Sequence, residues 1–359
     1  MKKVGLVTIF DNMNFGNRLQ NYALQHVLET EFDAKVVTLA ADHQMRFMIM
    51  VKAVALSVLS KFPFGITRSV TDLRWDAFRS FTKRYIKTKV FWGMDKIPQW
   101  INDKFDVFIA GSDQIWNWRL PVVRSHAEDY FLCFADSEKR NSYSASFGVD
   151  FVEEEWAEFY RMQLGMFQNL SVREEAGKRI ISELINKTAS LNIDPTLLLT
   201  QKEWEKIEKR PKCFKKGQPY MLTYFLGDRK KMDSIASSKK LVQVDLLNET
   251  SDVYISGPSE FIYWIRHADF VCTDSFHATV FSIIFCRPFI VVSRPGMNSR
   301  IETLLKSLGL EDRFIELEKM KEFDYGKPCD YQYAYKVIAR EKRRSIDYLK
   351  RLLEKTQEE

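Results

Sequence analysis

Residues 4–28 read VGLVTIFDNMNFGNRLQNYALQHVL and contain the pattern that decides the fold. The apolar run 4–10 predicts a strand that is buried on both faces of a parallel sheet. A polar loop follows as far as Gly16, and apolar residues then recur at helical spacing over 19–28. A strand, a polar loop and a helix in this order predict the opening unit of a Rossmann-like domain.

The chain is long enough for two such domains. A length of 359 residues exceeds what one ordinary core holds, so two domains are expected. Further strands of the first domain are predicted at 35–39, 106–110 and 170–173, and a charged stretch at 201–217 predicts the boundary. A second series of strands is predicted at 220–225, 241–246, 270–273 and 289–292, with helices near 258–267 and 277–285.

The resulting division is an N-terminal Rossmann-like domain over 1–200, with a helical insertion at about 43–100, and a C-terminal Rossmann-like domain over 201–335. Residues 336–359 are expected to form a basic helix that crosses back to the N-terminal domain. Two α/β domains of this kind, facing a cleft, would resemble the glycosyltransferase B architecture.

Composition excludes several functions. The 54 basic residues are interspersed with 48 acidic ones, and a net charge of +6 suits an anionic small substrate or an acidic membrane surface better than nucleic acid. The five cysteines are widely spaced, which predicts neither a disulfide framework nor a zinc site. The N-terminus has no secretory cleavage pattern, so we expect a cytoplasmic protein.

The strongest chemical signal is ADFVCTDSFHATV at residues 268–280. An apolar strand ends there in Thr-Asp-Ser, and His277 lies at the start of an apolar helix. Helix N-termini bind anions such as phosphate through free backbone N–H groups. One turn thus offers an acid/base group beside a phosphate site. From these residues alone, a packed or capping His277 explains the pattern equally well.

A second signal is FDVFIAGSDQIWN at residues 105–117. Gly111 allows a sharp turn after the strand, and Ser112, Asp113 and Gln114 then place short hydrogen-bonding groups at its carboxyl end, as a sugar site requires. Trp116 could stack on a sugar ring, although packing at the domain edge is the favoured interpretation.

Two further segments carry polar groups. Gly16, Asn17, Gln20 and Asn21 lead into the first helix without the GxGxxG spacing of a dinucleotide site. Arg173 follows a short strand and could bind a carboxylate or phosphate in bidentate fashion, or pair with Glu174 or Glu175 at the surface.

These segments, together with SYSASFG at 142–148, NIDPTL at 192–197 and the stretch 294–310, occur in the order of the polysaccharide pyruvyl transferase family. The chain resembles that family over about residues 4–313. The resemblance implies two Rossmann-like domains, phosphoenolpyruvate as donor with no further cofactor, and two hydroxyls of a sugar as acceptor, which pyruvate bridges as a cyclic ketal. It also implies that the sugar is part of a polysaccharide or of a lipid-linked precursor.

The resemblance also assigns residues. His277 matches the family's histidine and Arg173 its Val-Arg arginine, and we add Asp113 as a base to complete the expected catalytic set. The expected donor-binding residues are Thr273, Ser275, Asn298, Ser299, Arg300 and Arg294. The expected acceptor-binding residues are Gly16, Asn17, Gln20, Asn21, Gly111, Ser112, Gln114 and Trp116. No metal is expected, because the chemistry requires none.

One departure from the family concerns the donor pocket. Some members carry Arg-Leu-His where this chain has Ser275-Phe276-His277, so a donor-binding arginine is missing here. Arg300, Arg294 or Arg287 is expected to replace its charge.

Residues 46–64 read RFMIMVKAVALSVLSKFPF, and their apolar runs are too short to span a bilayer. The segment either packs on the first domain or lies at the membrane interface at the inner face of the membrane. Two other functions stay open: a glycosyltransferase that uses a nucleotide sugar on the same architecture, and a glycan-binding protein without activity.

Overall fold

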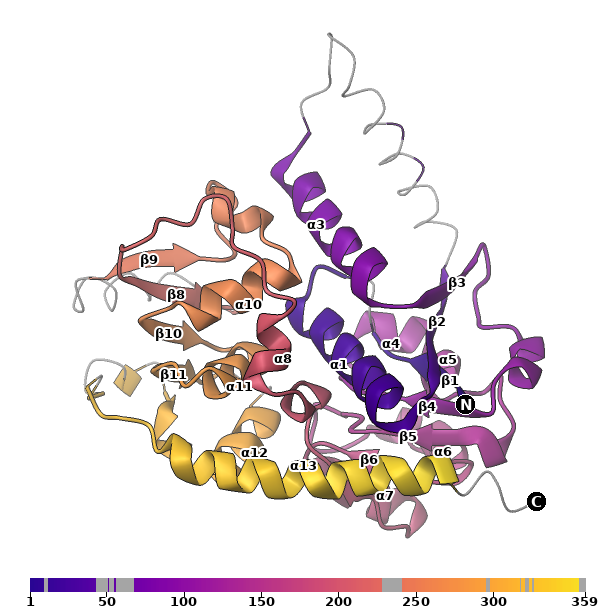
Figure 1. Ribbon diagram of the computed structural model, residues 1–359. Helices are drawn as coiled ribbons and strands as arrows, with labels where there is room; N and C mark the ends of the chain where they lie inside the picture. The colour runs from indigo at the N-terminus through magenta and orange to yellow at the C-terminus, as the bar shows by residue number, and fades with distance from the viewer. Residues whose placement is uncertain are drawn as a thin grey trace. The chain divides into compact units, whose positions relative to one another are not determined.

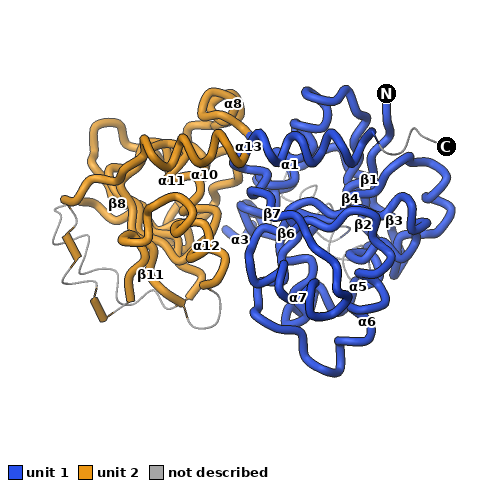
Figure 2. The backbone as a smooth tube through the Cα atoms, turned by 90° about the horizontal axis from the view of Figure 1, so that it is seen from below, with its two compact units in different colours: residues 1–198, 342–359 blue, residues 199–341 orange. Residues whose placement is uncertain are grey.

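The computed structural model describes residues 1–9, 12–42, 51, 55, 68–227, 241–294, 298–316, 318–319, 323–324 and 326–354. The chain divides into two compact units (Figure 2). Unit 1 comprises residues 1–198 and 342–359, and unit 2 comprises residues 199–341. Apart from Val51 and Ala55, segment 46–64, for which packing on the first domain and membrane contact were both considered, lies outside the described residues.

Unit 1 is built on a parallel sheet with helices around it (Figure 1). Its elements are β1 (Lys3–Val7), α1 (Phe15–Phe32), β2 (Lys35–Asp42), α3 (Val70–Tyr85), β3 (Thr88–Trp92), η1 (Gln99–Lys104), β4 (Val107–Ala110), α4 (Pro121–Ser125), α5 (Ala127–Tyr130), η2 (Ser137–Lys139), β5 (Arg140–Ser142), α6 (Glu154–Gly165), β6 (Ser171–Val172), α7 (Glu175–Ile185), β7 (Ser190–Leu191) and η3 (Pro195–Leu198).

The strand order of unit 1 sets the position of its ligand site. The main sheet has the order β3-β2-β1-β4-β5, with all pairs parallel. Backbone bridges from Asn141 to Asn169 and from Ala145 to Val172 continue it to β6, which pairs with β7. This is the doubly wound order, in which ligands bind outside the carboxyl ends of the two strands where the direction of winding reverses. In unit 1 those strands are β1 and β4.

Unit 2 has its own parallel sheet. Its elements are α8 (Gln201–Glu205), β8 (Tyr220–Tyr224), β9 (Val242–Asp245), η4 (Asp252–Ile255), α10 (Pro258–Arg266), β10 (Phe270–Thr273), α11 (Phe276–Ile284), β11 (Phe289–Val292), α12 (Ser299–Leu308), η5 (Glu311–Arg313) and β12 (Phe314–Ile315). The strand order is β12-β11-β10-β8-β9. Winding reverses between β8 and β10, so the carboxyl ends of these two strands mark the expected site of unit 2.

The helix α13 (Tyr331–Glu354) contributes to both units. Its first part buries Ala334 and Val337 in unit 2. Its second part belongs to unit 1, where Tyr348 donates a hydrogen bond to the backbone oxygen of Ser142 at 2.9 Å. Ser345 there accepts one from the Asn192 side chain at 3.1 Å. Both parts are therefore anchored by buried contacts rather than lying free on the surface.

Most strands match the ranges expected from the sequence, including β2, β4, β6, β8, β10 and β11. Four were not expected, and two of them, β5 and β7, are runs of only three and two residues. β3 falls inside the stretch interpreted as a helical insertion, where it pairs with β2, and β12 adds a short edge to the sheet of unit 2.

Candidate functional site

The site of unit 1 begins with two turns at the carboxyl ends of β1 and β4. After β1, the Asn14 side chain caps α1 by accepting hydrogen bonds from the backbone N–H groups of Gly16 and Asn17. After β4, Gly111 has a φ of 116°, and a Cβ there would lie 2.4 Å from the backbone oxygen of Tyr143. Only glycine fits this position, and the turn that it makes brings Asp113 to the start of α1.

The Asp113 carboxylate is held from several directions. Asn17 Nδ2 donates a hydrogen bond to Asp113 Oδ2, and the Gln114 backbone N–H donates to Oδ1 at 2.8 Å. Arg173 Nη2 lies 3.3 Å from the same Oδ1. The Asp113 side chain keeps 8% of its surface exposed. A fixed, charged oxygen that remains accessible is what a general base requires.

Arg173 is surrounded by carboxylates. Its Nη1 lies 2.6 Å from Asp194 Oδ2, its Nε lies 4.0 Å from Glu174 Oε2, and its side chain is 1% exposed. Burial alone lowers the pKa of Arg173, but the charges of Asp194, Asp113 and Glu174 outweigh burial and raise the pKa above its usual value. The guanidinium is therefore a buried partner of protein carboxylates. The pairing with Glu174 considered from the sequence is present, but it is buried and not at the surface.

The remaining acceptor candidates of unit 1 mostly brace the two turns. Thr8 Oγ1 donates to the backbone oxygen of Ser112 at 2.7 Å, and Gln20 Nε2 donates to Thr8 Oγ1 at 2.9 Å. Asn21 Oδ1 accepts from Thr38 Oγ1 at 2.9 Å, which ties α1 to β2. All four side chains are at most 3% exposed. They fix the backbone around Asp113 and present little surface to a ligand, as does the buried Gly16.

Trp116 is a core residue. Its side chain has no exposed surface, and its rings stack on Phe131 at 5.6 Å and pack against Phe147 and Phe167. Gln114, by contrast, is partly exposed and accepts a hydrogen bond from Asn117 Nδ2. The expectation that Trp116 binds the acceptor is therefore wrong, because Trp116 exposes no ring face on which a sugar could stack.

In unit 2, the turn after β10 is fixed by hydroxyl groups. Thr273 Oγ1 donates to the backbone oxygen of Tyr224 at 2.6 Å and accepts from the Ser275 backbone N–H at 3.0 Å. The Ser275 side chain caps α11 by accepting from the Ala278 backbone N–H. Asp274 accepts from the backbone N–H groups of Leu226 and Gly227 at 2.7 and 2.8 Å. These contacts join the carboxyl ends of β8 and β10.

His277 lies in the first turn of α11, at this same edge. Its ring packs edge-on against Phe276 at 5.2 Å, and 7% of the residue is exposed. Arg300, in the first turn of α12, places its guanidinium over the Phe276 ring, 5.7 Å from the ring centroid. Phe276 thus holds an imidazole and a guanidinium beside the N-terminus of one helix, where backbone N–H groups also favour an anion.

The three arginines considered as replacements for the missing one lie at different edges. Arg294 follows β11 at the carboxyl edge, where its Nη1 is 3.6 Å from Asp274 Oδ2. Asn298 Oδ1 accepts from the Arg294 backbone N–H at 2.9 Å, and Ser299 begins α12 beside it. Arg287 precedes β11 and so lies at the edge of the sheet where the strands begin. Its Nε donates a hydrogen bond to the backbone oxygen of Phe285. Arg287 therefore lies away from the His277 turn, whereas Arg294 and Arg300 lie at the same edge of the sheet as this turn.

Sequence reasoning gave no role to two carboxylates that organise these sites. Asp194 binds Arg173 in unit 1, and Asp274 binds two backbone N–H groups and Arg294 in unit 2. Both follow the carboxyl end of a strand, and that position was the signal that could have found them. Within the described residues, no group of three or more His, Cys, Asp or Glu side chains could hold a metal ion. In the same ranges, no helix is long and apolar enough to cross a bilayer.

Solved structures with a similar fold include nucleotide-sugar enzymes. A putative UDP-N-acetylglucosamine 2-epimerase from Listeria monocytogenes has 10% identity and a TM-score of 0.51, over 99% of this chain and 98% of that one. The UDP-GlcNAc 2-epimerase from Neisseria meningitidis has 9% identity and a TM-score of 0.48, over 98% and 100%. At such identities the likeness concerns the fold alone. It agrees with the two parallel-sheet units, and the chain has an α/β fold of the glycosyltransferase B type.

The sequence comparison identifies the family. No curated protein sequence matches the chain. The family described as polysaccharide pyruvyl transferase matches residues 14–295, which include the turn that positions Asp113, the Arg173 cluster and the His277 turn. The chain therefore belongs to the polysaccharide pyruvyl transferase family.

Proposed function

We propose that this transferase moves pyruvate from phosphoenolpyruvate to two hydroxyls of one sugar and forms a cyclic ketal. Membership of the family supports the transfer of pyruvate to a polysaccharide. The observation that carries the finer proposal is the His277 turn, where an imidazole, the N-terminus of α11 and the cations Arg294 and Arg300 share the carboxyl edge of one sheet. An enol phosphate needs both a proton and anion binding, and this turn offers both.

The chemistry has four steps that balance. A proton adds to the methylene carbon of phosphoenolpyruvate, which becomes the methyl group. The first sugar hydroxyl adds to the neighbouring carbon and releases its proton. The bond from that carbon to the phosphate oxygen then breaks, and phosphate leaves with its electron pair. The second hydroxyl adds in its place and releases its proton, which the departed phosphate takes up, so the products are the ketal and inorganic phosphate.

Unit 2 supplies the residues for the donor. His277 delivers the proton to the methylene carbon, and the N-terminal N–H groups of α11 bind anionic oxygen atoms. Arg300 and Arg294 bind the carboxylate and phosphate groups of the donor, in place of the arginine that other family members carry at the position of Ser275. Thr273, Ser275 and Asp274 hold the turn in shape through the hydrogen bonds described above.

Unit 1 supplies the residues for the acceptor. Asp113 takes the proton of a sugar hydroxyl. Asn17 and Arg173 fix its carboxylate, and Asp194 in turn fixes Arg173. Arg173 is accordingly a positioning residue, because its guanidinium is buried against carboxylates. The acceptor in this proposal is a lipid-linked sugar presented at the cytoplasmic face of the membrane.

Mass spectrometry of glycolipid acceptors incubated with the protein and phosphoenolpyruvate tests the proposal. The expected product carries one pyruvate, added with loss of water, and phosphate appears in equal amount. A parallel reaction supplies nucleotide sugars instead of phosphoenolpyruvate. Transfer of a sugar in that reaction, with no pyruvylated product in the first, would assign the chain to glycosyl transfer and refute the proposal.

A further inference from the structure

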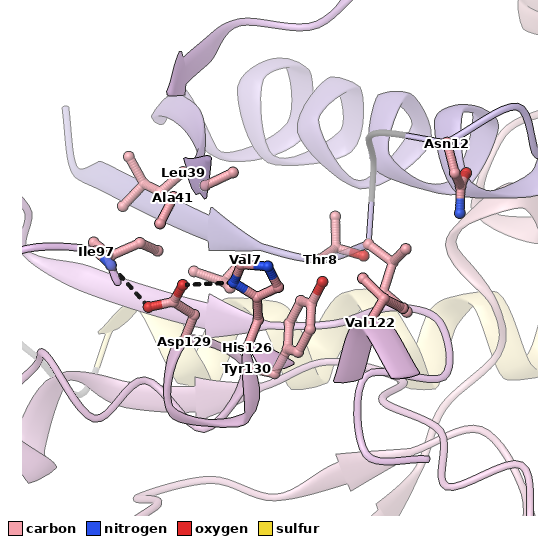
Figure 3. Close-up of a pocket in the computed structure, with 12 residues that line it drawn as sticks. Val7, Thr8, Asn12, Leu39, Ala41, Ile97, Val122, His126, Asp129 and Tyr130 are labelled. Carbon is pink, nitrogen blue, oxygen red and sulfur yellow. Dashed lines mark hydrogen bonds and ion pairs between the residues drawn. The ribbon is translucent and has the colours of Figure 1, made fainter. Parts of the chain in front are cut away.

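A small pocket lies in unit 1 at the carboxyl ends of β1 and β2 (Figure 3). Its volume is about 110 Å³. Drug-sized ligands occupy pockets of about 300–1,000 Å³, so this one takes a single chemical group or part of a ring. None of the residues expected from the sequence to bind the acceptor lines it. The pocket is therefore a feature that neither the motifs nor the proposed catalytic residues account for.

The lining has an apolar part and a polar part. Val7, Leu39 and Ile97 are among the apolar residues, and they are contributed by β1, β2 and the segment before η1. The polar part comes from His126, which lies between α4 and α5, and from Asp129 and Tyr130 in α5, and Figure 3 shows their side chains grouped beside the end of β1. A sugar ring combines apolar C–H faces with hydroxyl edges, and a lining of both kinds suits it.

His126 is oriented by its neighbour Asp129. Asp129 Oδ1 accepts a hydrogen bond from the Ile97 backbone N–H at 2.9 Å, which fixes the carboxylate. Asp129 Oδ2 lies 3.7 Å from His126 Nδ1, and the two side chains are 6% and 13% exposed. Since the carboxylate faces Nδ1, the other ring nitrogen, Nε2, is directed away from Asp129. With the carboxylate beside Nδ1, Nε2 is the ring nitrogen to which we assign a hydrogen bond with a ligand.

The pocket is linked to the Asp113 turn through Thr8. Thr8 lines the pocket, and its hydroxyl donates to the backbone oxygen of Ser112, the residue before Asp113. The winding of the sheet also reverses beside β1, which is the place where folds of this kind bind ligands. Thr8 thus contacts both the pocket and the turn that positions Asp113.

We propose that the pocket is a subsite for the acceptor sugar, which receives a hydroxyl-bearing edge of the ring or of the next sugar residue. His126 hydrogen-bonds that edge, Asp129 positions His126, and the apolar residues contact the C–H face. The inference rests on the proposed function, because it takes the acceptor to be a sugar. It goes further in naming residues that select among sugars rather than residues that transfer pyruvate.

Steady-state kinetics on the full chain tests the subsite. His126→Ala removes one hydrogen bond to the acceptor, so the KM for the acceptor should rise about 2- to 12-fold while the donor KM stays unchanged. His126→Gln keeps a hydrogen-bonding group and should recover part of the loss. Asp129→Asn can still accept from Ile97 but loses its charge, so it should raise the acceptor KM with little change in kcat. His26→Ala on α1, outside the pocket, is the matched control.

Two outcomes separate this inference from the proposed function. If the wild-type protein transfers pyruvate and His126→Ala leaves the acceptor KM unchanged, the subsite is refuted and the proposed function stands. If the wild-type protein transfers none, the imidazole NMR signals of His126 are followed during titration with the methyl glycosides of glucose, galactose and mannose. A saturable shift whose midpoint Asp129→Asn moves to a higher glycoside concentration supports the subsite on its own, and no shift with any glycoside refutes it.

Discussion

Arg173 Nη1 lies 2.6 Å from Asp194 Oδ2, and these two side chains are 1% and 0% exposed. The pair joins the residue after β6 to the loop after β7, and the second guanidinium nitrogen reaches Asp113. Arg173 therefore connects three loops at one edge of the sheet. Its charge is needed there because burying the carboxylates without a cation costs more than burying the ion pair.

Replacing Arg173 should destabilise unit 1. Arg173→Met leaves Asp194 and Asp113 buried without their cation, and the free energy of unfolding should fall by about 3–5 kcal/mol. Chemical denaturation followed by circular dichroism measures this. Arg179→Met on α7 is the control, because the Arg179 side chain is 56% exposed and its Nε lies 4.0 Å from Glu183 Oε1, so its loss should cost at most about 1 kcal/mol. Equal losses for the two variants would contradict a buried role for Arg173.

Replacing His277 should abolish activity and leave the fold intact. Proton delivery by a positioned residue is typically worth about 10² to 10⁴ in rate, and His277→Ala should lower kcat by that factor. Pyruvyl transfer is measured by phosphate release, and thermal unfolding checks the fold. His267→Ala is the matched control, since His267 stacks on Tyr263 before β10, at the opposite edge of the sheet. Near-wild-type turnover in His277→Ala would remove His277 from the mechanism.

Replacing Arg294 or Arg300 should raise the KM for phosphoenolpyruvate, whereas replacing Arg287 should not. Arg294→Ala and Arg300→Ala each remove a cation from the carboxyl edge of unit 2 and should raise the KM for phosphoenolpyruvate about 10- to 100-fold, as the loss of a charged hydrogen bond implies. Arg287→Ala should leave it unchanged, because Arg287 lies at the amino edge. An effect of Arg287→Ala that equals the other two would overturn this assignment.

The turn at Gly111 should not accept a side chain. Gly111→Ala forces a non-glycine residue into φ 116°, which costs about 1–3 kcal/mol, and its Cβ would meet the Tyr143 oxygen at 2.4 Å. We expect a lower melting temperature and loss of activity. Gly165→Ala, at the end of α6, is the control: its Cβ would have no neighbour within 4 Å, and alanine there should be neutral or stabilising. Equal melting temperatures would show that the turn can adjust.

The buried parallel strands could be predicted from the sequence because they are short apolar runs that end in polar turns. β8, β10 and β11 have this form, and each lies at its expected place. β3 does not, because it is an edge strand whose residues are mostly exposed and include Lys89, so it carries no continuous apolar signal. Its pairing with β2 depends on the folded sheet, which no local pattern records.

The sequence predicts where the candidate site residues lie relative to the strands better than it predicts what each side chain contacts. Asp113 and His277 follow strand ends, and a strand end can be found in a sequence. The burial of Arg173 depends on Asp194 and Asp113, which reach it from separate loops. The burial of Trp116 depends likewise on its packing against Phe131 and Phe147. Contacts between distant segments decide whether such a side chain binds a ligand or packs in the core, and the sequence alone does not contain them.

Helix α13 also determines the order in which the protein can fold during synthesis. Its residues from 342 onward complete unit 1, where Leu349, Leu352 and Leu353 are buried. The ribosome makes these residues only after all of unit 2. Unit 2 can therefore fold while unit 1 still lacks its last helix, although most of unit 1 is synthesised first. The nascent unit 1 must remain incomplete, with the apolar surface beneath α13 uncovered, until Leu349, Leu352 and Leu353 have been synthesised.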